Sequence, residues 1–130
     1  MAVRTTFTAG EVLTAADLTD TFESKANETI AIGAETTSYT LILTDQGSLV
    51  TVNSASATTV TIPANATVEF PTGTAVAVAA LGAGVVTITG AAGVTVNSTA
   101  GTAPDISDQY AGAQCYKTAT DTWLVIGSIA

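Results

Sequence analysis

Charge is almost absent from the middle of this chain. The stretch from Gln46 to Pro104 contains a single charged side chain, Glu69, and its Val and Ile residues alternate with Thr. Alternation of apolar and polar residues with a period of two is typical of strands that bury one face. Soluble domains usually carry about 25% charged residues. We therefore expect a β domain that covers part of its uncharged exterior against copies of itself.

Gly, Pro and Asn residues divide this region into short segments of strand-like sequence. The expected strands cover residues 39–43, 49–53, 58–62, 74–80, 85–89, 94–97, 109–118 and 122–126. The last two are expected to form a hairpin, and Gly82-Ala83-Gly84 is interpreted as another hairpin turn. Short strands at this spacing predict an all-β fold, a small antiparallel β-sandwich or barrel.

Two short similarities within the chain do not form an obvious repeat. VTVNS occurs at 50–54 and at 94–98, but the flanking residues do not match. Thr-x-Thr pairs at 59–61 and 87–89 also lack a fixed repeat. We interpret them as ordinary strands with Thr outward and Val or Ile inward, and not as a solenoid or an ice-binding array.

The N-terminal part differs in composition, since six of the eleven carboxylates lie in the first 35 residues. A capping-box pattern precedes a segment in which Leu18 and Phe22 share one helical face. These features predict an N-terminal arm with one short helix at about 15–27. The domain organisation expected is 1–35 for arm and helix, and 36–130 for the β domain.

Composition excludes several classes of function. The chain has no His and one cysteine, Cys115, which argues against His-based catalysis, a disulfide and common zinc sites. A net charge of −8 with three basic residues disfavours binding to nucleic acid or an anionic membrane. We expect no enzymatic activity, no cofactor and no metal site. Cys115 is interpreted as an inert, partly buried thiol. Asp105, Asp108 and Asp121 are interpreted as solvated loop acids in preference to Ca²⁺ ligands.

The apolar strand positions give a set of candidates for the core or for contacts between subunits. They are Val60, Ile62, Val76, Val78, Val86, Ile88, Trp123, Leu124 and Ile126.

Two stretches resemble bacteriophage virion proteins. FTAGEVLTAADL at residues 7–18 resembles an opening found in many phage fibre, tail and head-surface proteins, although Thr19 stands where Asn is common. Residues 41–90, 93–98 and 116–129 are similar to a β domain of phage tail-fibre and minor structural proteins. The resemblance implies a structural component of the virion, and a homotrimer.

Because the chain is short and has no shaft or coiled-coil heptads, the resemblance favours a capsid decoration protein or head fibre. It implies a location on the capsid surface after assembly in the bacterial host cytoplasm, with the major capsid protein and the chain itself as partners. The apolar residues expected to bind the capsid or a neighbouring subunit are Phe7, Val12, Leu13, Leu18 and Phe22.

Other functions remain open from the sequence. One alternative is a tail-associated fibre or minor tail protein that contacts the host surface. Another is a glycan-binding module that uses Trp123, Tyr110 and Tyr116 for stacking, although core placement of these aromatics is more typical.

Overall fold

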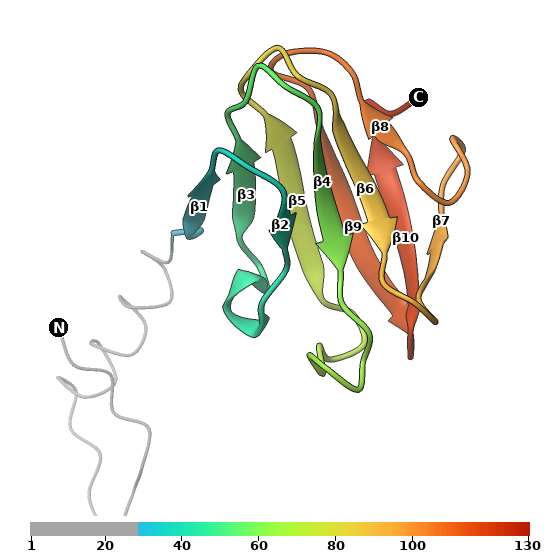
Figure 1. Ribbon diagram of the computed structural model, residues 1–130. Helices are drawn as coiled ribbons and strands as arrows, with labels where there is room; N and C mark the ends of the chain where they lie inside the picture. Colours follow the sequence, from blue (N-terminus) through green and yellow to red (C-terminus); the bar gives the residue numbers. More distant parts are fainter. Residues whose placement is uncertain (1–28) are drawn as a thin grey trace, which may run out of the picture.

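Successive strands of the chain alternate between two facing sheets (Figure 1). The computed structural model describes residues 29–130. In spatial order, the six-stranded sheet consists of β1 (Ile32–Glu35), β3 (Leu49–Val52), β5 (Ala75–Ala80), β9 (Gly112–Ala119), β10 (Thr122–Gly127) and β7 (Thr95–Asn97). The four-stranded sheet consists of β2 (Tyr39–Thr40), β4 (Thr58–Ile62), β6 (Val86–Gly90) and β8 (Asp105–Ile106). A 3-10 turn, η1 (Leu43–Asp45), connects β2 to β3.

The all-β class is confirmed, but the antiparallel arrangement is wrong. Five strand pairs are parallel: β1 with β3, β3 with β5, β2 with β4, β4 with β6, and β7 with β10. Only β5–β9, β9–β10 and β6–β8 are antiparallel among the described strands. The reason is the alternation itself. From β1 to β6 each connection carries the chain to the other sheet, so a strand returns beside the previous strand of its own sheet in the same direction.

This winding places a repeat in space that the sequence hides. Thr59 pairs with Thr87, and Thr61 pairs with Thr89, so both Thr-x-Thr motifs lie in register on β4 and β6. The two pairs thus lie side by side on one sheet, which does not by itself make a fixed repeat along the chain. Their assignment as outward Thr beside inward Val and Ile is confirmed by the alternating burial along both strands.

Gly82-Ala83-Gly84 is not a hairpin turn, because it connects β5 in one sheet to β6 in the other. This connection stacks directly on the one between β3 and β4. The Gly84 amide donates to the Ser54 carbonyl at 2.8 Å. A Cβ on Gly84 would lie 2.2 Å from the Ser56 carbonyl oxygen. Glycine is required here because the two backbones approach so closely.

Most expected strand positions are confirmed, including the hairpin of β9 and β10. The segment expected at 39–43 is shorter, because η1 begins at Leu43 and β2 covers two residues. β1 and β8 were not expected. β1 lies within residues 1–35, which the sequence analysis grouped with the arm, and it pairs with β3.

One apolar core lies between the sheets. Phe70 and Trp123 meet edge to face in it, with ring centroids 5.5 Å apart. Seven of the nine core candidates are buried there: Val60, Ile62, Val76, Val78, Val86, Ile88 and Trp123. Leu124 and Ile126 lie on the opposite side of β10, away from this core.

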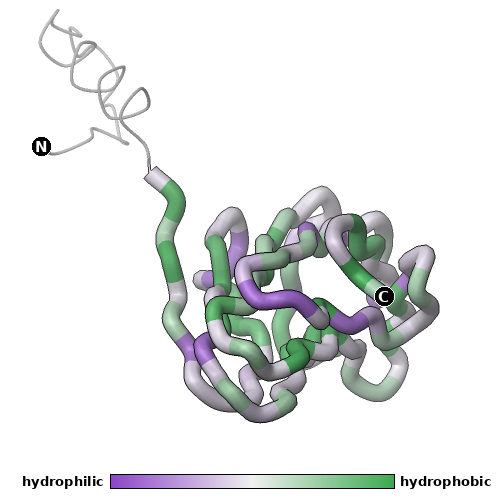
Figure 2. The backbone as a smooth tube through the Cα atoms, turned by 90° about the horizontal axis from the view of Figure 1, so that it is seen from above, coloured by the Kyte–Doolittle hydropathy of each residue, from purple (hydrophilic) through white to green (hydrophobic). Residues whose placement is uncertain are grey.

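The chain enters the domain at its edge. Residues 29–32 lead away from the body of the β domain, and β1 is the outermost strand of its sheet (Figure 2). Ile30 and Ile32 are 65% and 67% exposed there. The helix expected at 15–27 lies outside the described residues.

Candidate interaction surface

The outer face of the six-stranded sheet is a continuous surface without charge. Strand register aligns Ile32, Leu49, Ala77, Gln114 and Ile126 in one row across five strands. We call this surface the neutral face. It consists of Ile32, Ala34, Leu49, Thr51, Ala75, Ala77, Ala79, Gly112, Gln114, Tyr116, Leu124 and Ile126.

All charged side chains of residues 29–130 lie elsewhere. Lys117 points into the domain from β9, and Asp105 lies on the four-stranded sheet. The full set is Glu35, Asp45, Glu69, Asp105, Asp108, Lys117 and Asp121. A patch of this kind on an acidic chain is the feature most typical of a protein interaction surface.

The neutral face is not flat. A shallow hollow of about 330 Å³ lies over the small residues of β5 and β9, with Leu49 on one side and Ile126 on the other. Gln114 lines this hollow, and its Oε1 is buried without a hydrogen-bond partner in the described structure. The face therefore has an apolar trough between two ridges, with one unsatisfied amide oxygen in the trough.

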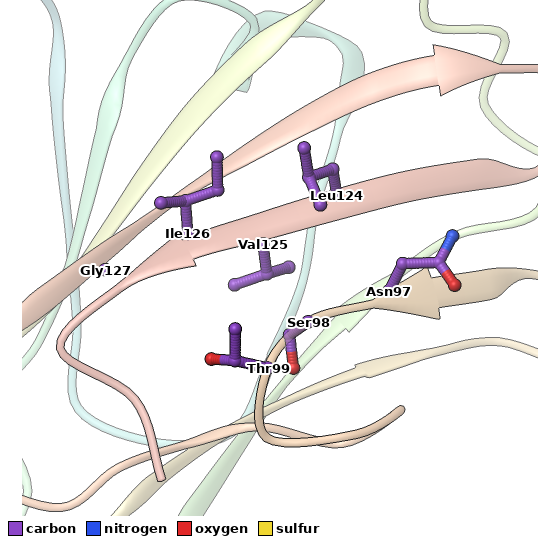
Figure 3. A pocket seen from close by; sticks show the side chains of 7 residues that line it. All are labelled: Asn97, Ser98, Thr99, Leu124, Val125, Ile126 and Gly127. Atoms are coloured by element: carbon purple, nitrogen blue, oxygen red, sulfur yellow. The ribbon is translucent and has the colours of Figure 1, made fainter.

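A second hollow, of about 480 Å³, lies where β7 ends beside β10 (Figure 3). β7 pairs with β10 only as far as Asn97 beside Leu124, whereas β10 continues to Gly127. In this view Leu124 and Ile126 stand on the same side of β10, and Val125 points to the other side. Leu124 and Ile126 thus belong to the neutral face, and this hollow borders it.

The opposite face of the domain has a different chemistry. Thr59, Thr61, Thr87 and Thr89 form two in-register pairs on the four-stranded sheet. The Thr87 hydroxyl donates to Asp105 Oδ1 at 2.5 Å. This surface presents hydroxyls and carries a charge, so it is readily solvated.

The late carboxylates do not converge. Asp105 is on β8, whereas Asp121 is in the β9–β10 turn. The Oδ1 of Asp121 accepts a hydrogen bond from the backbone N–H of Asn65 at 2.7 Å. Asp108 lines a small hollow with Asp105 and Ser107. Within residues 29–130, no group of three or more Cys, Asp or Glu side chains lies together as a metal site would require.

Lys117 is 4% exposed and sits at the end of the core. Its Nζ donates to Asn65 Oδ1 and to the Phe70 carbonyl, both at 2.5 Å. The backbone N–H of Asn65 also donates a hydrogen bond to the Asp121 carboxylate. These groups therefore connect the 63–74 segment to the β9–β10 hairpin. A buried ammonium group that donates to two carbonyl oxygens in this way holds a loop in place.

Two further groups have altered acidity. Burial raises the pKa of Tyr39 to about 12, and its hydrogen bond to Asp45 Oδ2, at 2.7 Å, adds to this effect. The same Asp45 oxygen accepts the Ile42 amide at 2.8 Å, so this carboxylate organises the turn between β2 and β3. Burial raises the pKa of the Cys115 thiol to about 12, and the thiol is fully and not partly buried.

The three aromatic candidates for glycan stacking differ in how exposed their side chains are. Trp123 is 1% exposed and belongs to the core. Tyr110 is 77% exposed in a loop, and Tyr116 lies on the neutral face. The described structure thus leaves no stacking platform that includes Trp123.

The five residues expected to bind the capsid lie outside the described residues. The sequence analysis did not identify the neutral face, apart from Leu124 and Ile126. A signal was present: Ala75, Ala77 and Ala79 alternate with buried Val76 and Val78. Small apolar residues at the outward positions of a strand indicate a face that another surface covers.

Searches of protein-family models, of curated proteins and of solved structures find no match to this chain. Among residues 29–130, no helix has the length and apolar character needed to cross a membrane.

Proposed function

We propose that this chain is a non-enzymatic structural protein of a bacteriophage virion that decorates the capsid in many copies. The setting comes from the resemblance of residues 7–18 and 41–129 to phage virion proteins. Its proposed partners are the major capsid protein and further copies of the chain, with a homotrimer as the assembly that the resemblance implies.

One observation carries the proposed division of labour. The chain enters the β domain through an edge strand, and residues 29–32 lead away from the body of the domain (Figure 2). The described part of the chain therefore begins outside the core of the domain. An attachment segment that contains the proposed docking residues at 7–22 can bind the capsid while the β domain projects from the shell.

The test is co-sedimentation of the full chain with undecorated expanded capsids and, separately, with isolated tails of the same phage. We expect saturable binding of many copies to capsids. Leu18→Asp should abolish this binding because it places a charge among the proposed docking residues, whereas Thr19→Asp is the matched control one residue away. Trp123 fluorescence reports that both variants keep a folded β domain.

Two outcomes overturn the proposal. If the chain does not bind capsids, the proposal that it is a decoration protein is refuted. If a few copies bind to tails instead, the chain is the tail-associated protein of the alternative. Full capsid binding by Leu18→Asp refutes the assignment of the docking residues.

A further inference from the structure

We propose that the neutral face is the surface through which this chain binds another copy of itself. This inference deepens the self-association in the proposed function and rests on it only for the existence of an oligomer. All residues of the neutral face belong to the β domain, so the same contact between copies is expected on a capsid and on a tail.

Charge selects the partner. The chain has a net charge of −8, and none of the charged groups of residues 29–130 lies on the neutral face. Two acidic copies that approach through other surfaces bring like charges together, which is unfavourable. A basic partner would find no carboxylate on the neutral face with which to pair. An identical face meets neither obstacle, because neither copy has a charge to desolvate there.

Shape supports the same partner. The trough over Ala77, Ala79 and Gly112 lies between the Leu49 ridge and the Ile126 ridge. A symmetric contact brings the same patch of both copies together, so each ridge must find a trough. The neutral face carries both elements side by side and is therefore complementary to itself.

The neutral face is large enough for a weak contact. Its five strands, spaced by about 4.8 Å and each about five residues long, cover about 24 Å by about 17 Å. The footprint is roughly 400 Å² per copy, or about 800 Å² for a pair, which is below the size of a standard specific interface. A contact of this size fits an association that depends on protein concentration.

The test is the mass of the full chain in solution, measured by light scattering during size-exclusion chromatography over a range of concentrations. Because a symmetric contact closes with two copies, we expect a mass of twice 12.9 kDa that falls toward 12.9 kDa on dilution, and a threefold mass overturns the symmetric contact. Raising the salt concentration should strengthen association, because salt screens the repulsion between acidic copies. An assembly held by ion pairs would weaken instead.

Ile126→Glu is the diagnostic variant, and Leu43→Glu is its control. The two side chains are 55% and 54% exposed, and only Ile126 is on the neutral face. Both substitutions remove an exposed apolar residue and add one negative charge, so their effects on folding should be similar. We expect Ile126→Glu to shift the mass to 12.9 kDa at concentrations where Leu43→Glu remains assembled.

A cross-linking experiment locates the contact. Ala77→Cys in the trough should couple two copies through a short bismaleimide, whereas Thr61→Cys on the opposite sheet should not. Native Cys115 is buried and does not compete. A monomeric wild-type chain at every concentration overturns the inference, and so does an Ile126→Glu variant that stays assembled. Neither result affects capsid binding, which the co-sedimentation experiment measures separately.

Discussion

Replacing Gly84 by Ala tests the stacking of the connections between the two sheets. The added Cβ would lie 2.2 Å from the Ser56 carbonyl oxygen and 2.9 Å from the Ser54 carbonyl oxygen. Both neighbours are backbone atoms, so the connections must separate. Separation breaks the hydrogen bond from the Gly84 amide to Ser54, which costs about 1 kcal/mol. Backbone displacement adds about 2 kcal/mol, in the range seen for overpacking. We expect a loss of about 3 kcal/mol in the free energy of unfolding.

Gly33→Ala is the matched control, because a Cβ there meets nothing within 4 Å and the residue has no positive φ. Its effect should stay within about 0.5 kcal/mol. Urea unfolding followed by the fluorescence of Trp123, the one Trp of the chain, measures both variants. Equal midpoints for Gly84→Ala and Gly33→Ala would refute the close stacking of these connections and the parallel winding that produces it.

Three other groups give direct predictions. Cys115 should resist iodoacetamide at about pH 8 in the folded protein and react after unfolding, because burial raises the pKa of its thiol to about 12. Between its ordinary pKa of 9.0 and this value the unfolded chain releases a proton that the folded chain keeps, so the free energy of unfolding should fall as pH rises, by about 1.4 kcal/mol per unit. Asp45→Asn should lower the pKa of Tyr39, measured by tyrosinate absorbance, because it removes the carboxylate that opposes ionisation; an unchanged titration would contradict this cause. Lys117→Met should cost about 2 kcal/mol in urea unfolding, because it leaves two carbonyl acceptors without a buried donor; an unchanged midpoint would show that these contacts do not stabilise the loop.

The positions of the strands could be predicted from sequence, because each depends on local alternation. Residues 58–62 alternate Thr with Val and Ile, and they form β4 as expected. β8 has two residues and β1 contains a glycine, so neither produces a clear period. The turn between β9 and β10 was also found, because it joins strands that are adjacent in the chain.

The direction of the pairing could not be predicted from the same signals. Alternating burial is identical in a parallel and an antiparallel strand, and the sequence does not state which sheet a connection reaches. Gly82 and Gly84 are equally suited to a hairpin and to a close approach of two backbones. Only contacts with Ser54 and Ser56, distant along the chain, separate the two possibilities. The interpretation of the two VTVNS segments as ordinary strands agrees with the structure, since β3 and β7 are not neighbours in their sheet.

The winding of the chain explains why the two faces of the domain differ so much. The strands β1, β3 and β5 of one sheet, and β2, β4 and β6 of the other, come from successive turns, so a short alternation in one segment is extended sideways by the segment that follows it. Ala77 thereby lies beside Leu49, and Thr61 lies beside Thr89. One face collects small apolar residues from five strands, and the other collects hydroxyls. Hydroxyls are readily hydrated, whereas a broad apolar surface is not. Exposure to water is therefore more favourable for the threonine face than for the neutral face. With the self-association that we propose, the threonine face meets water and the neutral face meets a second copy.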